Sequence, residues 1–232
     1  MELRPYQKEA KEAIFEQWDS GVSKNPAGPS YWMWKDGSTL PKVTEECVRQ
    51  GDRVLILAHR GELLEQAADK LMKTTGLGCA LEKAESSCQG SWFRVVVGSV
   101  QTLMREKRLN SFDPFYFNTI IIDEAHHCIS DSYQRVLQHF PHAHVLGVTA
   151  TPDRGDMRNL GAYFESLAYE YTLPKAIKEG YLSPIKALTI PLKIDMSSVS
   201  VQAGDFKASE IGTALDPYLQ GIAEENAEIL HG

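Results

Sequence analysis

The sequence lacks several features that would place it in a specialised class of protein. No run approaches the ~18 apolar residues that a membrane-spanning helix needs. The N-terminal segment Met1–Tyr6 is not followed by the apolar region of a secretory signal peptide. The four cysteines show no C-x-x-C spacing, which favours reduced thiols over a disulfide framework. These absences predict a cytoplasmic protein with no membrane partner.

An excess of positive charge is also absent. The net charge is −7, from 24 lysine and arginine residues against 31 acidic ones. A broad basic surface for nucleic acid is therefore not expected, although backbone amides and a few side chains can still bind phosphates in a local groove. The apolar share of 43% over 232 residues is enough for one large domain or a domain and a half.

The sequence does contain an alternation of short β-branched runs and amphipathic segments. Strands are expected near residues 53–58, 93–97, 118–122, 144–148 and 185–192. Helices are expected near residues 4–18, 43–50, 62–72, 103, 132–139, 174–180 and 217–230. This alternation predicts an α/β fold with a parallel sheet and helices on both faces. Residues that follow parallel strands should lie together at one edge of the sheet. Here those residues are Arg60, Ser99, Asp123 and Thr149.

The strongest candidate for chemistry is Thr119–His127, where three isoleucines run into two carboxylates and two imidazoles. An apolar, β-branched run is typical of a strand buried on both faces. Asp123 and Glu124 would emerge at its carboxyl end, where open α/β sheets bind ligands. One carboxylate can hold Mg²⁺ on a nucleotide's phosphates while the other activates the attacking water. The alternative is a helix N-terminus that carries acids without a catalytic role.

Residues 24–41 interrupt this pattern at the position where the first buried strand is due. They contain three prolines and no hydrophobic period, and three aromatic residues crowd into Tyr31–Trp34. Prolines exclude a central strand, and such compositions are typical of loops. The sequence therefore predicts an irregular loop over residues 25–41 instead of a strand followed by a phosphate-binding turn.

Five short motifs, taken in order, resemble those of the N-terminal RecA-like ATPase domain of superfamily 2 helicases. The similarity is greatest to the branch that contains type III restriction-enzyme subunits and related DNA-repair helicases. The motifs are Arg4-Pro-Tyr-Gln7 (glutamine motif), Ala58-His-Arg60 through Gln66 (motif Ia), Gly98-Ser-Val-Gln-Thr102 (motif Ib), Asp123-Glu-Ala-His126 (motif II, in its DEAH form) and Thr149-Ala-Thr151 (motif III). The resemblance covers about residues 1–195 and implies a RecA-like P-loop NTPase fold.

The resemblance also implies ATP and Mg²⁺ as cofactors, and nucleic acid, with DNA favoured, as the partner. It assigns catalysis to Asp123, Glu124 and His126, with Asp123 coordinating Mg²⁺ through water and Glu124 activating the hydrolytic water. Adenine contacts fall to Arg4, Tyr6 and Gln7. Nucleic-acid contacts fall to His59, Arg60, Ser99, Gln101 and Thr102. Coupling between the two sites falls to Thr149 and Thr151, together with His126. Outside the motif context, Gln7 is compatible with a solvated helix face and the two threonines with plain β propensity.

Two features depart from the family pattern. No Gly-x-Gly-Lys-Thr phosphate loop stands between the glutamine motif and motif Ia, and its amides and lysine are what cradle the β- and γ-phosphates. The second RecA-like domain, whose arginines reach the γ-phosphate in the family, is also missing from this chain. We therefore expect an ATP-binding domain at 1–195 with an aberrant segment at 25–41. Residues 196–232 would be a linker and the start of a truncated second domain.

The aberrant segment has a testable origin in the reading frame. Tryptophan and methionine each have a single codon, so translating Trp32–Trp34 one base later gives Gly-Cys-Gly whatever the gene's codon usage. Residues 35–36 then become Lys or Arg followed by Thr or Met, and residues 29–31 can become Leu-Pro-Thr. The product, Leu-Pro-Thr-Gly-Cys-Gly-Lys-Thr, is a helicase phosphate loop. We predict a local frameshift over about residues 25–41, restored by Lys42; the alternative is a genuine, divergent insertion.

Other functions remain open at this point. A zinc hydrolase is one, because candidate ligands cluster in sequence, although no H-E-x-x-H or C-x-x-C spacing occurs. Those candidates are His126, His127, Cys128, His139, His142 and His144. The other is a catalytically inactive, helicase-derived module that binds only nucleic acid or a partner, which the missing phosphate loop favours. A metal assay and an ATPase assay would separate these from a helicase, of which the chain as written is expected to be an impaired fragment.

Overall fold

The computed structural model describes residues 3–27, 39–59, 61–84, 86–149, 163–185, 201–202, 205–206 and 215–218. The chain divides into two compact units, residues 1–182 and 183–232. In the second unit, β7 (Val201–Gln202) and β8 (Asp205–Phe206) form an antiparallel ribbon, and η2 (Asp216–Tyr218) is a 3₁₀ turn. No helix in the described ranges is long and apolar enough to cross a membrane.

The first unit is built on a parallel sheet with the strand order β1-β6-β5-β2-β4-β3. Its strands are β1 (Lys24–Ala27), β2 (Val54–Ala58), β3 (Cys79–Glu82), β4 (Val95–Ser99), β5 (Thr119–Asp123) and β6 (His144–Val148). The structure confirms the expected strands at β2, β4, β5 and β6, and with them the parallel α/β fold. β3 was not expected from the sequence. The strand expected at 185–192 lies outside the described residues after Ile185, as do the expected domain boundary near 195 and the helix expected at 217–230 after Tyr218.

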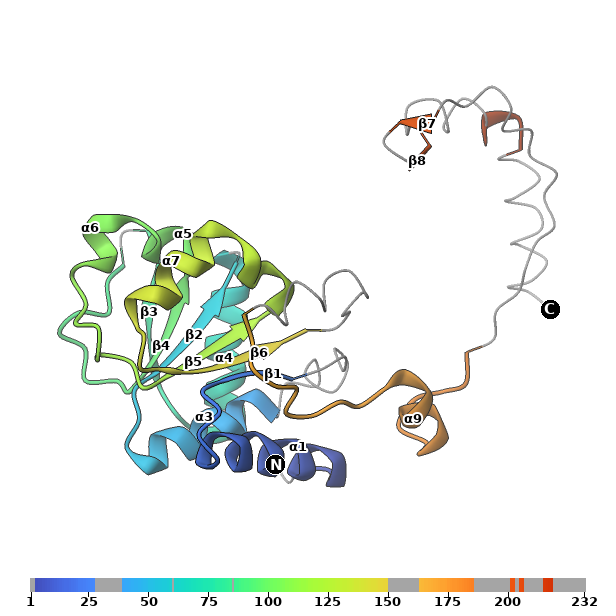
Figure 1. Ribbon diagram of the computed structural model, residues 1–232, viewed down its shortest axis with the longest axis horizontal. Helices are drawn as coiled ribbons and strands as arrows, with labels where there is room; N and C mark the ends of the chain where they lie inside the picture. Colours follow the sequence, from blue (N-terminus) through green and yellow to red (C-terminus); the bar gives the residue numbers. More distant parts are fainter. Residues whose placement is uncertain are drawn as a thin grey trace. The chain divides into compact units, whose positions relative to one another are not determined.

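Helices cover both faces of this sheet (Figure 1). One face carries α1 (Pro5–Asp19), α3 (Thr39–Gln50) and α4 (Gly61–Thr75), and the other carries α5 (Val100–Leu103), α6 (Glu106–Leu109) and α7 (Asp131–His139). Farther along the chain, α9 (Leu173–Lys178) contributes Ala176 to the same hydrophobic cluster as α1. Pro5 opens α1, where its missing N–H costs no helical hydrogen bond.

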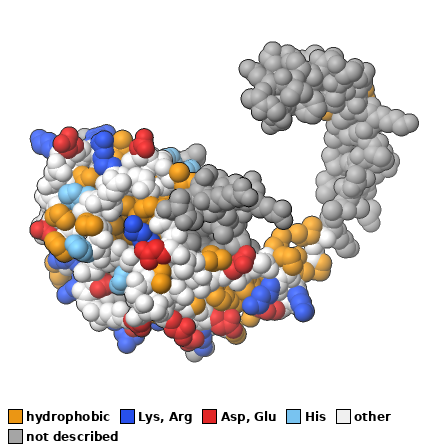
Figure 2. All heavy atoms as spheres, viewed as in Figure 1, with side chains coloured by type: hydrophobic (Ala, Val, Ile, Leu, Met, Phe, Trp, Pro, Cys, Tyr) orange, Lys and Arg blue, Asp and Glu red, His pale blue; other side chains and the backbone are white. Residues whose placement is uncertain are grey.

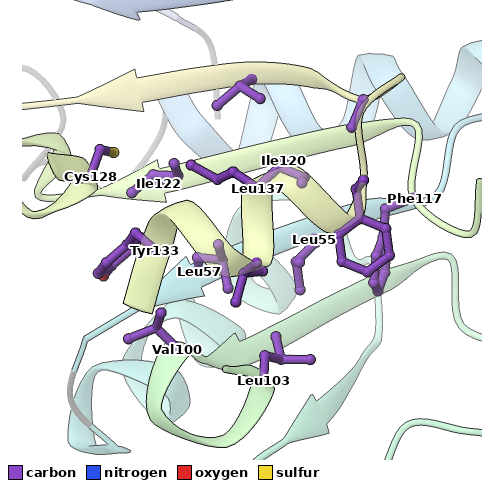
Figure 3. Close-up of a cluster of buried hydrophobic side chains, with 14 of the residues drawn as sticks. Leu55, Leu57, Val100, Leu103, Phe117, Ile120, Ile122, Cys128, Tyr133 and Leu137 are labelled. Atoms are coloured by element: carbon purple, nitrogen blue, oxygen red, sulfur yellow. The ribbon is translucent and has the colours of Figure 1, made fainter. Parts of the chain in front are cut away.

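Alternation along the strands divides the interior into two hydrophobic clusters. In β2, Val54 and Ile56 belong to the cluster beneath α1, α3 and α4, whereas Leu55 and Leu57 belong to the cluster beneath α5 and α7. Figure 3 shows the second cluster, in which Leu55 and Leu57 lie on the same side of the sheet as Leu137 of α7. All residues of β2 and β4 are buried, as expected for parallel strands covered on both faces.

β1 corrects the prediction of an irregular loop over residues 25–41. Lys24–Ala27 pair in parallel with β6, and α3 already begins at Thr39, so residues 28–38 are the part of the segment outside the described structure. Val145 N–H donates to Ser23 O at 2.7 Å, whereas Lys24 O faces away from β6 and accepts the Glu165 N–H at 2.9 Å. Backbone groups two residues apart in a strand point to the same side, so the backbone of Pro26, like that of Lys24, points away from β6. The N–H that proline lacks would therefore not have bonded to β6. Main-chain pairing at this position overrides the poor strand propensity of the sequence.

Candidate functional site

The carboxyl edge of the sheet collects the polar residues that follow its strands. Ala58 pairs with Ser99 across β2 and β4, and Asp123 pairs with Val148 across β5 and β6. Ser99, Asp123 and Thr149 therefore share one edge, which confirms their predicted placement. Arg60 and Thr151, which were assigned to the nucleic-acid site and to coupling, lie outside the described residues.

The turn after β5, which joins it to the 3₁₀ helix η1 (Ala125–Ile129), has an unusual backbone conformation. Glu124 has φ 61° and ψ 57°, a left-handed conformation that costs roughly 1–2 kcal/mol for a residue with a side chain. The neighbouring residues Ile122 and Ala125 are fully buried and hold the turn in place. Strained residues held by their surroundings gather at functional sites. The conformation thus marks Glu124 independently of the motif in which it stands.

Asp123 and Glu124 form a like-charged pair at the end of β5. Burial raises the pKa of Asp123, and the neighbouring Glu124 charge raises it further. The Glu124 N–H donates to Asp123 Oδ1 at 3.1 Å and opposes this shift, as do the charges of Lys70 and His126. A divalent cation is stabilised by the same negative charges that disfavour ionisation of Asp123. The pair therefore fits the predicted role of Asp123 as a Mg²⁺ ligand.

No group of three or more His, Cys, Asp or Glu side chains in the described ranges could hold a metal ion. A zinc centre usually has three or four protein ligands, so these ranges give the zinc hydrolase alternative no support. Mg²⁺, in contrast, is commonly held by one or two carboxylates together with water and substrate phosphates. The donor set at Asp123 is of that second kind.

A stack of aromatic rings joins the end of β2 to the turn after β5. The His59 and His127 rings are nearly parallel, with centroids 4.7 Å apart, and Tyr133 of α7 lies 6.5 Å from each with similar tilt. His126 packs on His127 at 4.1 Å, and its Nδ1 is 3.3 Å from Glu124 Oε2. Sequence reasoning missed His127 and Tyr133 as partners of His59, because no spacing in the sequence signals contacts between separate elements.

Several buried polar atoms at this edge have no hydrogen-bond partner among the described residues. They are His59 Nδ1, Tyr133 Oη and Thr149 Oγ1. Tyr133 is fully buried and Thr149 is 2% exposed. Leaving such a group unpaired typically costs about 1–3 kcal/mol, and most buried polar groups are paired. Their concentration around the carboxylate pair marks a place where a ligand, an ion or water would complete the hydrogen bonding.

The glutamine motif lies at the start of α1 and is largely buried. Gln7 is 1% exposed, and its Oε1 accepts the Arg4 N–H at 2.8 Å. The alternative that placed Gln7 on a solvated helix face is therefore wrong. Tyr6 stacks on Tyr171 at 4.8 Å and meets Tyr181 edge-on at 4.7 Å. Arg4 is exposed, with its guanidinium 5.7 Å from the centre of the Tyr181 ring.

In motif Ib, the side chains of Ser99 and Thr102 form hydrogen bonds to other groups of the protein. The hydroxyl of Ser99, 6% exposed, donates to Oε1 of the exposed Gln101 at 2.7 Å. Thr102 is 5% exposed, and its Oγ1 accepts the Ala84 N–H at 3.0 Å. Of the predicted nucleic-acid contacts in this motif, Gln101 is thus the side chain presented at the surface. The face seen in Figure 2 carries interspersed acidic and basic side chains and no continuous basic surface.

The parallel sheet and the carboxylate pair at its carboxyl edge define a RecA-like domain of the helicase type, and solved helicase structures share this fold. A family model described as "Type III restriction enzyme, res subunit" matches residues 1–154. The chain belongs to this family, which places it with helicases and the helicase subunits of restriction enzymes.

Individual relatives agree with that placement. The putative ATP-dependent helicase IRC3 of Saccharomyces cerevisiae is 34% identical over 72% of this chain and 25% of its own length. The putative mitochondrial ATP-dependent helicase irc3 of Schizosaccharomyces pombe is 30% identical over 84% of this chain and 34% of its own length. A solved structure of the ATP-dependent Type ISP restriction-modification enzyme LlaBIII bound to DNA has a TM-score of 0.61 at 18% identity, covering 78% of this chain and 16% of that enzyme. The chain therefore spans about a quarter to a third of the length of these curated relatives.

Proposed function

We propose that this chain is the N-terminal ATP-binding part of a motor that couples ATP hydrolysis to movement along nucleic acid, with DNA as the favoured track. The observation that carries the proposal is the Asp123–Glu124 pair, held in a strained turn among unpartnered polar atoms at the carboxyl edge. Kinship with ATP-dependent helicases supports ATP as the cofactor. The DNA-bound state of LlaBIII supports the choice of DNA.

The residues of this edge would divide the chemistry between them. Mg²⁺, when bound, neutralises charge on the β- and γ-phosphates, and Asp123 would hold it through water. Glu124 would orient the attacking water and accept its proton. His126, 3.3 Å from the Glu124 carboxylate, would fix the direction of that carboxylate. Thr149 and Thr151 would relay the state of the nucleotide to the nucleic-acid site.

In the same proposal, the chain as written hydrolyses ATP negligibly. Charge that develops on the phosphoryl oxygens needs the amides and lysine of a phosphate loop, and arginines from a second domain. A local frameshift over residues 25–41 accounts for the missing loop. The position of β1 supports this origin, because a strand precedes the phosphate loop in this type of domain. The same missing loop favours the second candidate, an inactive module that binds only nucleic acid or a partner.

Calorimetry with ATP and Mg²⁺ tests the proposal on the chain and on a restored variant. In the variant, residues 25–36 become Thr-Leu-Leu-Val-Leu-Pro-Thr-Gly-Cys-Gly-Lys-Thr, followed by an apolar run. We expect no measurable binding by the parent and micromolar binding by the variant, with turnover low until a second domain is added. Replacing the restored lysine with alanine is the control and should abolish the gain. Micromolar binding by the parent would mean that its own segment is a working substitute for the loop.

The nucleotide sequence of codons 24–42 tests the frameshift directly. The proposal requires that a shift of one base across this interval yields the phosphate loop without a stop codon. A divergent insertion is not expected to encode a continuous helicase segment in the second frame.

A further inference from the structure

The corner where β3 meets α5 and α6 contains a buried carboxylate that has no part in the chemistry proposed above. Glu82 ends β3 and has no exposed surface. It accepts the Cys88 N–H at 2.7 Å and the Ser87 hydroxyl at 3.3 Å, and Arg108 Nη1 lies 3.1 Å from its Oε1. Removing an ion pair from water carries a desolvation cost, so stability alone is a weak reason for its presence.

Arg108 extends this contact towards motif Ib. Its Nη2 donates to Ala84 O at 2.8 Å, so one planar guanidinium bridges Glu82 and Ala84. Ala84 has φ 36°, a left-handed conformation that a residue with a side chain adopts only when its surroundings impose it. The Ala84 N–H in turn donates to Thr102 Oγ1 at 3.0 Å. A continuous chain of polar contacts therefore runs from the end of β3 to motif Ib.

We propose that the Glu82–Arg108 pair positions motif Ib for the nucleic-acid strand, by holding Ala84 in the conformation that fixes Thr102. The inference rests on the proposed function, since it requires that this edge of the sheet binds nucleic acid. Arg108 is 24% exposed and both of its terminal nitrogens face protein acceptors. It acts on the strand through Thr102 and is a positioning residue, not a phosphate contact.

A purely electrostatic role of the Glu82 carboxylate and a role in positioning motif Ib predict opposite changes in nucleic-acid affinity for Glu82→Gln. If the carboxylate acts only through its charge, removing it near a site for a polyanion should tighten binding. If it positions motif Ib, the neutral amide should weaken binding, because it no longer matches the guanidinium with a charged acceptor. The direction of the change in affinity separates the two roles, which a measurement of stability would not.

The experiment measures binding of the full chain to a labelled single-stranded deoxythymidine oligonucleotide by fluorescence anisotropy at several salt concentrations. We expect Glu82→Gln to weaken binding about tenfold while the slope of log K against log salt stays unchanged, because no phosphate contact is lost. The matched control is Asp69→Asn, which removes the same charge from an exposed pair on α4 outside motif Ia, where Lys73 Nζ lies 2.6 Å from Asp69 Oδ2. The control should bind at least as tightly as the parent.

Arg108→Lys provides a second variant in case Glu82→Gln does not fold, as judged by circular dichroism. It keeps the charge, but an ammonium cannot reproduce the planar fork that reaches both acceptors. Affinity should again fall at constant salt slope. The positioning role is overturned if Glu82→Gln binds as tightly as the parent or more tightly, or if a folded Arg108→Lys binds as the parent does. The proposed nucleic-acid site would stand in either case. A parent chain that does not bind the oligonucleotide at low salt overturns the nucleic-acid site and this role with it.

Discussion

Two corners of the same sheet edge differ in how completely their polar groups are paired. At the motif Ib corner, Ser99 pairs with Gln101 and Thr102 pairs with Ala84. At the turn after β5, Tyr133 Oη and Thr149 Oγ1 have no hydrogen-bond partner among the described residues. The hydroxyls of the first corner are therefore paired within the protein, whereas those of the second are left for groups that a bound ligand or water would supply.

The contrast follows from what each corner is proposed to bind. A nucleic-acid strand is held by many weak phosphate contacts, so its groove must keep its shape before the strand arrives. A site for phosphoryl transfer works through donors and acceptors aimed at charge that the substrate brings. Internal pairing thus suits the motif Ib corner, and unsatisfied groups suit the turn that carries Asp123 and Glu124.

The largest effect is expected from Glu124→Gln, made in a chain with the restored phosphate loop joined to a second RecA-like domain. Loss of a general base should lower hydrolysis by about 10² or more while ATP binding stays nearly unchanged. Single-turnover hydrolysis and calorimetry measure the two quantities separately. Equal loss of binding and turnover would assign Glu124 a structural role and would remove the contrast between the corners.

The next effect concerns the motif Ib corner and uses the chain as written. Binding to single-stranded DNA should weaken about tenfold or more between about 50 and 200 mM salt, because each phosphate contact releases counterions. Sequence preference should be slight, since phosphates carry no sequence information. Anisotropy with oligonucleotides of different base composition measures both properties. Affinity that is indifferent to salt and selective for sequence would contradict a phosphate-binding corner.

A smaller effect is expected from Gly147→Ala in β6. A Cβ there would lie 2.5 Å from Phe164 Cζ and 2.9 Å from the Ala125 Cβ, and overpacking of this kind costs about 1–3 kcal/mol. The melting temperature should fall by roughly 5 °C in a domain of this size. Phe164→Leu in the same chain should recover part of the loss. An unchanged melting temperature would show that the turn holding Ala125 is looser than its packing indicates.

The smallest expected effect is a gain in stability from Asp123→Asn. The pKa of Asp123 is raised by burial and by Glu124, so the folded state binds the proton more tightly than the unfolded state. This carboxyl therefore favours folding at low pH, and that contribution is lost as the pH rises through its raised pKa. The neutral amide should raise the melting temperature by about 1–3 °C at pH 7, with the gain shrinking in acid.

A matched control sharpens this prediction. Asp69→Asn removes a carboxylate that is 58% exposed and paired with Lys73 on α4, so it should give no gain at neutral pH. Melting curves of both variants at neutral and acidic pH make the comparison. A pH-independent gain for Asp123→Asn would point to packing instead of ionisation.

The sequence predicted the parts of the fold that depend on local composition. The apolar, β-branched runs of β2 and β5 specify buried strands, and parallel strands bring Asp123 and Thr149 to one edge. β3 (Cys79–Glu82) escaped prediction because its short sequence is neither strongly β-branched nor alternating. β1 was predicted wrongly because its place is determined by main-chain pairing with β6, which composition does not report.

The candidate site, like the fold, was predictable only where a local pattern in the sequence signals it. Motif order located the carboxylates, but neither the left-handed turn at Glu124 nor the stacking of His59 on His127 has a signature in the sequence. The Glu82–Arg108 pair also joins segments whose contact only the folded chain creates. Tertiary neighbours decide these features, so they become visible only in the structure.

The main-chain pairing of β1 has a consequence for the fate of the protein in a cell. Hydrogen bonds from the backbone hold this segment to β6, and Pro26, the one proline of β1, stands where β6 does not use an N–H. A product altered over residues 25–41 would therefore still fold around an intact sheet. Proteases and chaperones act on chains that are unfolded. A gene damaged in this segment would lose its chemistry and yet keep its protein, which would persist in the cell and occupy whatever partners the surviving surfaces recognise.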